Sequence, residues 1–499
     1  MFRSMIRVAV VVCLATVLSF PARGSEAERL FAEATRLDNA SDLAAALDAY
    51  RLLIDRFAAT PEAAEALARS AELQWARDDS SAAERLIETL RSRHPTSAAT
   101  ARGELLAGTM AMDRAGSLAD LAAARTILLR VPLGWDRGAF PDLQARARAR
   151  VAAAQIAFLL GDLDTAIAEA LLVAEDEPRG DYSAEAELLW ARASLAANAE
   201  LAPILEVLQR NVIENEGEAI GREAKAWLSL LHRRRIGPSV GRPWIDSARP
   251  FAATTMRLEE ATGVAADGDS IVVTDGSLPL IAILGTDESV RVRTAITTPR
   301  RPWWDVDRNA AAVGDDVLVR PFGGRRIGLT SPRGRDDALS DIEAATDDLF
   351  GGWWAIARRY DDVLLRYNTV TQPPREVRLQ DTRDLQDVAR DDRGRLYALD
   401  RDSQSVHRLD ADGRGDEIVA RGDWKRAAAL AIDRLGYLWV LDSGTRRVEM
   451  WDASGRLLMR LGPNLPGGIE LRDPVDIAVD GAGRVYLADE DLTHLVVLD

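Results

Sequence analysis

The C-terminal half of the chain repeats one short pattern, and this repeat constrains the fold more than any other feature. Each copy has an apolar run, a polar turn containing glycine, a second apolar run that ends in aspartate, and a third apolar run. The clearest copies are residues 387–400, 429–442 and 476–489. Their closing aspartates, Asp400, Asp442 and Asp489, stand 42 and 47 residues apart. A period of about 40–50 residues built from short strands predicts the blades of a β-propeller.

Six blades are predicted. Their innermost strands begin near Gly263, Asn309, Asp341, Asp387, Ala429 and Asp476. Residues 264–273 and 310–319 align without a gap, which supports the register of the first two blades. An unclosed propeller would leave an exposed sheet edge. We therefore expect residues 253–259 to pair beside the last strand, near residues 494–499.

Blades five and six also carry a recognisable motif. Residues 474–480 read PVDIAVD, residues 483–489 read GRVYLAD, and residues 447–455 read RVEMWDASG. These stretches resemble the NHL repeat, and the resemblance implies a six-bladed propeller that binds protein or RNA. The chain has 63 Lys and Arg residues against 79 Asp and Glu residues, a net charge of -16. This acidic balance argues against a nucleic-acid partner.

The first half is alanine-rich and has a helical period. Leu143, Ala147, Val151, Ala154 and Phe158 follow steps of three and four, which places one apolar stripe on one helix face. The sequence predicts an all-α solenoid over residues 25–235.

A repeat of 34 residues runs through this half. Thr60-Pro61 recurs near His94-Pro95, and residues 160–166 (LGDLDTA) resemble the turn of a tetratricopeptide repeat. The resemblance implies five or six helical hairpins with a concave peptide groove, and an unrelated α-solenoid is the alternative. Residues 236–250 contain three prolines and two glycines, which predicts a linker before a propeller at residues 251–499.

The N-terminus predicts a secretory signal peptide over residues 1–24. Arg3 and Arg7 precede an apolar stretch, and Ala22-Arg23-Gly24 forms a small-x-small site, so cleavage is expected near Gly24 and Ser25. The single cysteine, Cys13, lies inside this segment, so the mature chain would hold no thiol for a disulfide or a metal. No later stretch is predicted to span a bilayer. We expect a periplasmic or secreted protein.

The starts of the innermost strands form the first candidate site, because they ring one mouth of the channel. Asn309, Asp341, Asp387 and Asp476 would bring oxygen ligands towards one axis, which suits a hard cation such as Ca²⁺. The alternative is that each aspartate caps backbone N–H groups at a strand start. His407 and His494 fall in third strands, away from the channel, so a histidine zinc site is not expected there.

Two tryptophan pairs form the second candidate. Trp303 and Trp304 lie in a predicted connection between blades, where they would serve as a partner-binding or glycan-binding surface. Trp353 and Trp354 lie in a predicted strand, where packing between blades is expected.

These features predict a non-catalytic scaffold whose solenoid and propeller each bind protein partners of the cell envelope. The alternatives are a metal-dependent propeller hydrolase acting on an ester or lactone, and a protein that binds cell-wall glycan. No cofactor is expected apart from Ca²⁺ at the carboxylate ring.

Overall fold

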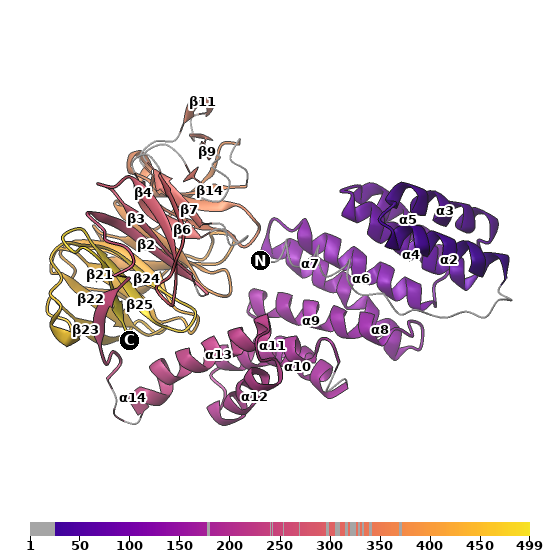
Figure 1. The fold of residues 1–499 in the computed structure, drawn as a ribbon, viewed down its shortest axis with the longest axis horizontal. Helices are drawn as coiled ribbons and strands as arrows, with labels where there is room; N and C mark the ends of the chain where they lie inside the picture. Colours follow the sequence, from indigo (N-terminus) through magenta and orange to yellow (C-terminus); the bar gives the residue numbers. More distant parts are fainter. Residues whose placement is uncertain are drawn as a thin grey trace. The chain divides into compact units, whose positions relative to one another are not determined.

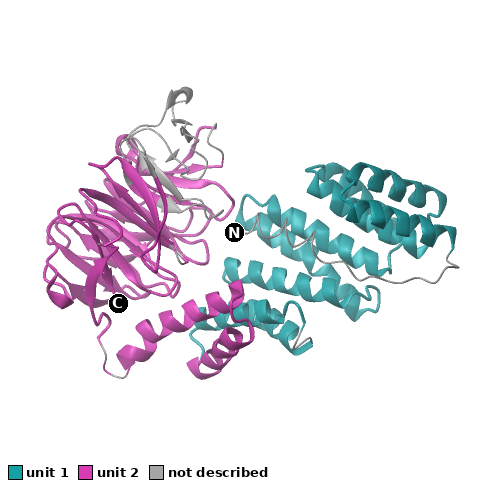
Figure 2. Ribbon diagram, viewed as in Figure 1, with its two compact units in different colours: residues 1–199 teal, residues 200–499 magenta. Residues whose placement is uncertain are grey.

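The computed structural model describes the chain from residue 25 to residue 499 with short gaps. The gaps are residues 177–179, 240, 242, 253, 269, 296–298, 305–309, 315–317, 320–325, 328–329, 332–333, 339–341 and 369–371; among residues 294–341, side chains are described for Arg301 and Pro302. The predicted signal peptide, residues 1–24, lies outside the described residues and stays a prediction. The chain divides into two compact units, residues 1–199 and 200–499 (Figure 2).

The first unit is helical in its described part. Its helices are α2 (Glu26–Asn39), α3 (Leu43–Arg56), α4 (Pro61–Ala76), α5 (Ser80–Arg93), α6 (Ala98–Asp113), α7 (Leu118–Leu128), α8 (Arg130–Asp136), α9 (Leu143–Leu160), α10 (Leu163–Asp176) and α11 (Ser183–Ala196). Consecutive helices pair, as α2 does with α3, and the first helix of one pair packs on the first helix of the next, as α2 does on α4 (Figure 1). The predicted helical repeats are confirmed; their tetratricopeptide character stays a prediction.

Local sequence signals begin and end these helices. Ser25 and Glu28 form a reciprocal capping box at the start of α2. The Thr60 side chain caps α4, with Pro61 in the first turn. Gly161 ends α9 with a φ of 81°, a left-handed conformation that glycine adopts without strain. The Gly-Asp turn therefore connects α9 to α10.

The second unit begins with α12 (Leu201–Glu214), α13 (Ala219–Leu231), the π-helical turn η1 (His232–Ile236) and α14 (Gly237–Ser239). Antiparallel sheets follow, and each blade is named after its innermost strand. The β2 blade holds β2 (Ala261–Asp267), β3 (Ser270–Asp275), β4 (Leu280–Gly285) and β5 (Val290–Ala295), and the β12 blade holds β12 (Ile342–Asp347), β13 (Trp353–Ala357), β14 (Val363–Tyr367) and β15 (Arg375–Arg378).

Three further blades complete this set. The β16 blade holds β16 (Leu385–Arg390), β17 (Leu396–Asp400), β18 (Ser405–Leu409) and β19 (Glu417–Arg421), and the β20 blade holds β20 (Ala427–Ile432), β21 (Leu438–Asp442), β22 (Arg447–Trp451) and β23 (Leu457–Leu461). The β24 blade holds β24 (Pro474–Val479), β25 (Val485–Asp489), β26 (Leu495–Leu498) and, from the start of the propeller, β1 (Ala248–Phe251).

The prediction of six blades is corrected to five. In place of another regular blade stands a reduced sheet of β6 (Pro299–Trp304), β7 (Ala310–Gly314), β8 (Leu318–Val319) and β9 (Arg326–Ile327), followed by the pair β10 (Thr330–Ser331) and β11 (Gly334–Ala338). In the described part of this sheet, β8 and β9 have two residues each, and residues 315–317, 320–325 and 328–329 beside them lie outside the described residues. The sequence between residues 320 and 337 is rich in glycine, proline, arginine and aspartate, which strands disfavour. The strand β6 still contacts β2 and β12 and completes the ring around the channel.

The predicted closing strand is placed wrongly by a few residues. Residues 248–251, and not residues 253–259, pair with β26, with Phe251 opposite Leu495. Ala248 and Phe251 are buried while the two residues between them are exposed. The reason is packing: the Phe251 ring meets Tyr486 edge to face at 5.1 Å. Exchange of an early strand into the last blade therefore closes the propeller.

The last helices belong to the propeller unit, which begins before the predicted linker of residues 236–250. Arg234 and Asp433 form an ion pair of 2.9 Å in which both side chains are fully buried. The Arg234 guanidinium also lies 4.7 Å from the centre of the Trp439 ring. These contacts hold the end of the helical segment against the β20 blade. In the described part of the chain, no helix has the length and apolar character needed to cross a bilayer.

Candidate functional site

A bulge at the start of each innermost strand builds the channel mouth. The register shifts between Ala261 and Gly263, Leu385 and Asp387, Ala427 and Ala429, and Pro474 and Asp476. The residue after the bulge is called the ring position here. In β12 the ring position is Ala344, and in β6 the shift ends at Pro302. The predicted ligands Asn309 and Asp341 lie outside the described residues.

Asp387 and Asp476 occupy ring positions, as the sequence predicts, and both are buried. Each carboxylate joins two adjacent blades. The Asp387 carboxylate accepts hydrogen bonds from the backbone N–H of its neighbour Val388 at 2.8 Å and from that of Leu430 in the next blade at 2.7 Å. Asp476 likewise accepts from Ile477 and from Val264 of the β2 blade, both at 2.9 Å. These two aspartates therefore cap backbone N–H groups between innermost strands.

Arg301, on β6, lies at the centre of the mouth. Its guanidinium donates to the carbonyls of Gln386 at 3.2 Å, Ala428 at 2.6 Å and Val475 at 3.1 Å. These are the bulged residues of three successive blades. The same guanidinium lies 3.6 Å from the Asp387 carboxylate and 3.9 Å from that of Asp476. The sequence pattern does not mark Arg301, because its segment reads as a connection between blades.

Gly263 allows this arrangement. A Cβ atom at this position would come within 2.7 Å of the Arg301 Cα and 3.0 Å of the Asp476 Oδ2. Glycine therefore permits β6 to approach β2 closely enough for Arg301 to reach the axis. The glycine that interrupts the predicted carboxylate ring thus has a packing role.

Asp387 and Asp476 each accept two N–H groups, and the Arg301 guanidinium lies beside both carboxylates and supplies a counter-charge. The predicted calcium site, which also includes Asn309 and Asp341, stays a prediction. Burial raises the pKa of Asp387, and it raises the pKa of Asp476 to about 7, against the opposing effect of Arg301. Among the residues that the structure describes, no three His, Cys, Asp or Glu side chains gather as a metal-ligand set.

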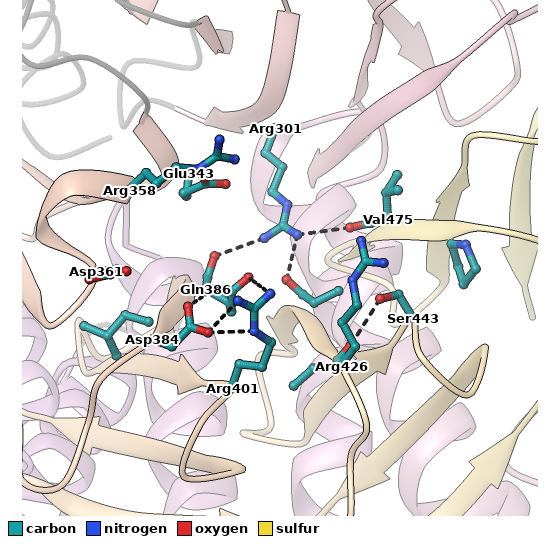
Figure 3. A pocket seen from close by; sticks show the side chains of 14 residues that line it. Arg301, Glu343, Arg358, Asp361, Asp384, Gln386, Arg401, Arg426, Ser443 and Val475 are labelled. Atoms are coloured by element: carbon teal, nitrogen blue, oxygen red, sulfur yellow. Dashed lines mark hydrogen bonds and ion pairs between the residues drawn. The ribbon is translucent and has the colours of Figure 1, made fainter.

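A pocket of about 390 Å³ opens at this mouth, and we call it the mouth pocket (Figure 3). Its charged lining residues are Arg301, Glu343, Arg358, Asp361, Asp384, Arg401 and Arg426. Two ion pairs account for four of them: Arg358 with Glu343 at 2.8 Å and Arg401 with Asp384 at 2.5 Å. Gln386 and Ser443 add polar groups. The pocket is therefore suited to a charged or strongly polar ligand.

The two predicted tryptophan pairs lie in different parts of the propeller. Trp303 and Trp304 lie on β6 and not in a connection, opposite Ala311 and Ala310 of β7, and their side chains lie outside the described part. Trp354 is buried in a cluster with Leu385 and other residues of the β16 blade, so its predicted packing between blades is confirmed. Trp353 packs on the other face of the β12 blade.

His407 belongs to an arrangement with the geometry of a hydrolase triad. Its Nε2 lies 2.9 Å from the Ser405 Oγ, and its Nδ1 lies 2.7 Å from the Asp416 Oδ1. Both Ser405 and His407 are fully buried, so a substrate has no access to them. The equivalent residue of the β20 blade, Glu449, accepts from the indole of Trp424. A buried polar residue at this place joins strands and loops within a blade.

Fold and site together define a β-propeller with an arginine at the centre of its mouth and a charged pocket around it. No known protein family and no curated protein sequence matches the chain. Solved structures match its propeller half. A streptogramin B lyase is 14% identical, covering 50% of this chain and 97% of that one, with a TM-score of 0.39.

Two other solved structures give similar values. Regucalcin from Agrobacterium tumefaciens, described as a calcium-binding protein, is 13% identical, covering 50% of this chain and 93% of that one, with a TM-score of 0.36. A putative gluconolactonase is 13% identical, covering 51% of this chain and 91% of that one, with a TM-score of 0.39. At these identities and scores the likeness carries no argument about ligand or reaction.

Proposed function

We propose that this protein is a non-catalytic scaffold of the periplasm or cell exterior, and that a protein partner of the cell envelope docks in the mouth pocket. The observation that carries the proposal is the position of Arg301. Its guanidinium occupies the axis, where a propeller hydrolase would need a reactive metal or base. Around it remains an open pocket with a charged rim, which suits recognition.

The hydrolase alternative receives less support from the same residues. Asp387 and Asp476 each hold two backbone N–H groups of adjacent blades and lie beside the Arg301 guanidinium, which favours a structural role for both carboxylates. Neither His407 nor His494 lines the mouth pocket. Turnover of lactones or aryl esters by the full chain, lost in a folded Arg301→Lys variant, would favour the enzyme.

Site-specific photo-cross-linking tests the docking proposal. A benzophenone amino acid replaces Ser443, which lines the mouth pocket, or Ile213, which is 75% exposed on α12. We expect one adduct of defined mass from a cell-envelope fraction with the probe at Ser443, and none with the probe at Ile213. The absence of an adduct at Ser443, or the same adduct at both positions, would contradict docking at the mouth.

The proposed location rests on the N-terminal sequence and has its own test. Arg3, Arg7 and the apolar stretch before Ala22 form the signal that we propose. Mass spectrometry of the protein from fractionated cells should give a mature chain that begins near Ser25 in the periplasmic or medium fraction. An intact N-terminus in the cytoplasmic fraction would contradict this location.

A further inference from the structure

We propose that the mouth pocket recognises a mixed-charge ligand, with Arg426 binding a carboxylate and Asp361 binding an ammonium or guanidinium group. This inference rests on the proposed function, because it takes the mouth pocket as the docking place. It adds the chemistry of the group that docks.

One backbone hydrogen bond recurs at the mouth and identifies equivalent positions in successive blades. The Arg401 N–H donates to the Asp384 carbonyl at 2.9 Å in the β16 blade. The Ser443 N–H donates to the Arg426 carbonyl at 3.0 Å in the β20 blade. The side chains of Asp384 and Arg401 then neutralise each other as an ion pair. In the β20 blade the partner residue is an uncharged serine, so the arginine has no acid at the equivalent place.

Arg426 is also the exception among the blades. The equivalent hydrogen bond occurs in two other blades. In the β2 blade the Gly276 N–H donates to the Glu260 carbonyl, and in the β24 blade the Glu490 N–H donates to the Asp473 carbonyl. The position is therefore acidic in three of these four blades and basic in one. The exposed Arg426 guanidinium forms no hydrogen bond or ion pair with any residue that the structure describes. It is available to an anionic group.

Asp361 is the acidic residue of the mouth pocket that could bind a cationic group. It lies in the turn before β14 and lines the mouth pocket, and it has no ion-pair partner in the described part of the chain. Burial and the nearby Asp384 carboxylate both raise its pKa, so a bound cation would relieve an unfavourable charge. The other acids lining the pocket, Glu343 and Asp384, already have arginine partners.

The two unpaired groups lie on different sides of the pocket. Figure 3 shows Asp361 beside the β12 blade and Arg426 beside the β20 blade, with the Arg401–Asp384 pair drawn between them. A pocket of about 390 Å³ suits a small zwitterion or a few residues of a peptide. A free zwitterion and a segment of a partner share this chemistry, and a competition experiment separates them.

Fluorescence anisotropy of labelled, end-blocked hexapeptides tests the inference on the full chain. The four peptides carry one lysine and one glutamate, two glutamates, two lysines or two glutamines, with glycine and serine elsewhere. We expect the lysine–glutamate peptide to bind most tightly. Arg426→Glu and Asp361→Lys should each weaken its binding about tenfold or more, because each replaces an attraction by a repulsion.

Matched controls lie one residue away. Lys425→Glu and Asp362→Lys make the same charge changes next to Arg426 and Asp361, at residues that do not line the pocket. They should change the affinity of the lysine–glutamate peptide by less than about twofold, since exposed charges interact weakly. Near-UV circular dichroism confirms the fold of all four variants. Competition by the unlabelled dipeptide lysyl-glutamate would support a free zwitterion as the natural source, and failure to compete would support a peptide segment.

Three results would overturn the mixed-charge inference: equal or tighter binding of a singly signed peptide, no binding of any peptide, or equal effects of the pocket variants and their neighbours. The cross-linking at Ser443 remains independent of them. An adduct at Ser443 without mixed-charge binding would refute the ligand class and leave the docking function standing.

Discussion

At the scale of single residues, the side chain of Arg301 joins three blades at the propeller mouth. Arg301 reaches three bulged carbonyls on three blades and lies between two buried carboxylates. Its planar fork of donors suits several acceptors at once, which a lysine ammonium cannot match in geometry. Asp387 and Asp476 gain a counter-charge from it. The centre of the mouth is therefore a mutually dependent group of three charged residues.

Removing this guanidinium should destabilise the propeller. We expect Arg301→Met to lower the free energy of unfolding by about 3–5 kcal/mol, because it leaves two buried carboxylates without a cation. Arg301→Lys should lower the free energy of unfolding by a smaller amount. Arg378→Ala, which removes an ion pair with a 66% exposed arginine, should cost below about 1 kcal/mol. Urea denaturation followed by tryptophan fluorescence measures all three, and a fully stable Arg301→Met would contradict the central role of this side chain.

The Asp476 carboxyl predicts a pH dependence. Its pKa in the folded state, about 7, lies above the ordinary value of 3.8, so the folded state binds the proton more tightly. This contribution to stability is fully present below about pH 4 and is lost as the pH rises towards 7. The stability of the wild type relative to Asp476→Asn should therefore fall between about pH 4 and pH 7 and level off above pH 7, with a total change of a few kcal/mol at about 1.4 kcal/mol per pKa unit.

The control for this measurement is Asp402→Asn, which alters an exposed acid on a turn of the β16 blade. Its stability relative to the wild type should not change over the same range of pH. A constant difference between the wild type and Asp476→Asn from pH 4 to pH 7 would show that folding does not raise the pKa of the Asp476 carboxyl, and would contradict this prediction.

At the scale of elements, the propeller depends on one borrowed strand. β1 adds to β26 through four paired positions, from Ala248 with Leu498 to Phe251 with Leu495. Without it, β26 would be an exposed edge with unpaired backbone groups. The strand is short, and its hold on the blade comes from the buried side chains Ala248 and Phe251.

Phe251 should therefore matter more than its exposed neighbour. We expect Phe251→Ala to cost about 3–5 kcal/mol through the cavity it leaves against Tyr486. It should also speed amide hydrogen exchange at residues 495–498. Arg249→Ala, on the same strand but 44% exposed, should cost below about 1 kcal/mol. Equal protection of residues 495–498 in both variants would argue against closure by β1.

At the scale of the whole molecule, the limit of the propeller unit lies inside the helical half. The buried Arg234–Asp433 pair and the Arg434 guanidinium, 5.6 Å from the Trp227 ring, hold α13 and η1 on the propeller. A chain cut at the proline-rich segment would lose these contacts and leave Asp433 without its cation.

Two shortened chains test this limit. Residues 200–499 should melt at the temperature of the propeller transition in the full chain. Residues 241–499 should melt several degrees lower, because Asp433 would lose its buried partner and the Trp439 face would be exposed. Calorimetry gives both values. Identical melting of the two shortened chains would assign the helices to the first unit.

The sequence by itself determined the elements and their repetition. The Asp-to-Asp spacing in the C-terminal half and the Thr-Pro and Gly-Asp signals in the N-terminal half are local, so propeller strands and helical hairpins followed from them. It also placed Asp387 and Asp476 at the mouth, because both stand at one position of the repeat.

Only the tertiary structure decided which groups contact these aspartates. Arg301 is separated from its carbonyl partners Gln386, Ala428 and Val475 by 85, 127 and 174 residues, and no repeat pattern reports such contacts. The bulges and the close approach at Gly263 set which residue of β6 reaches the axis. Closing a ring of blades brings residues together by geometry, and a local sequence pattern contains no information about that closure.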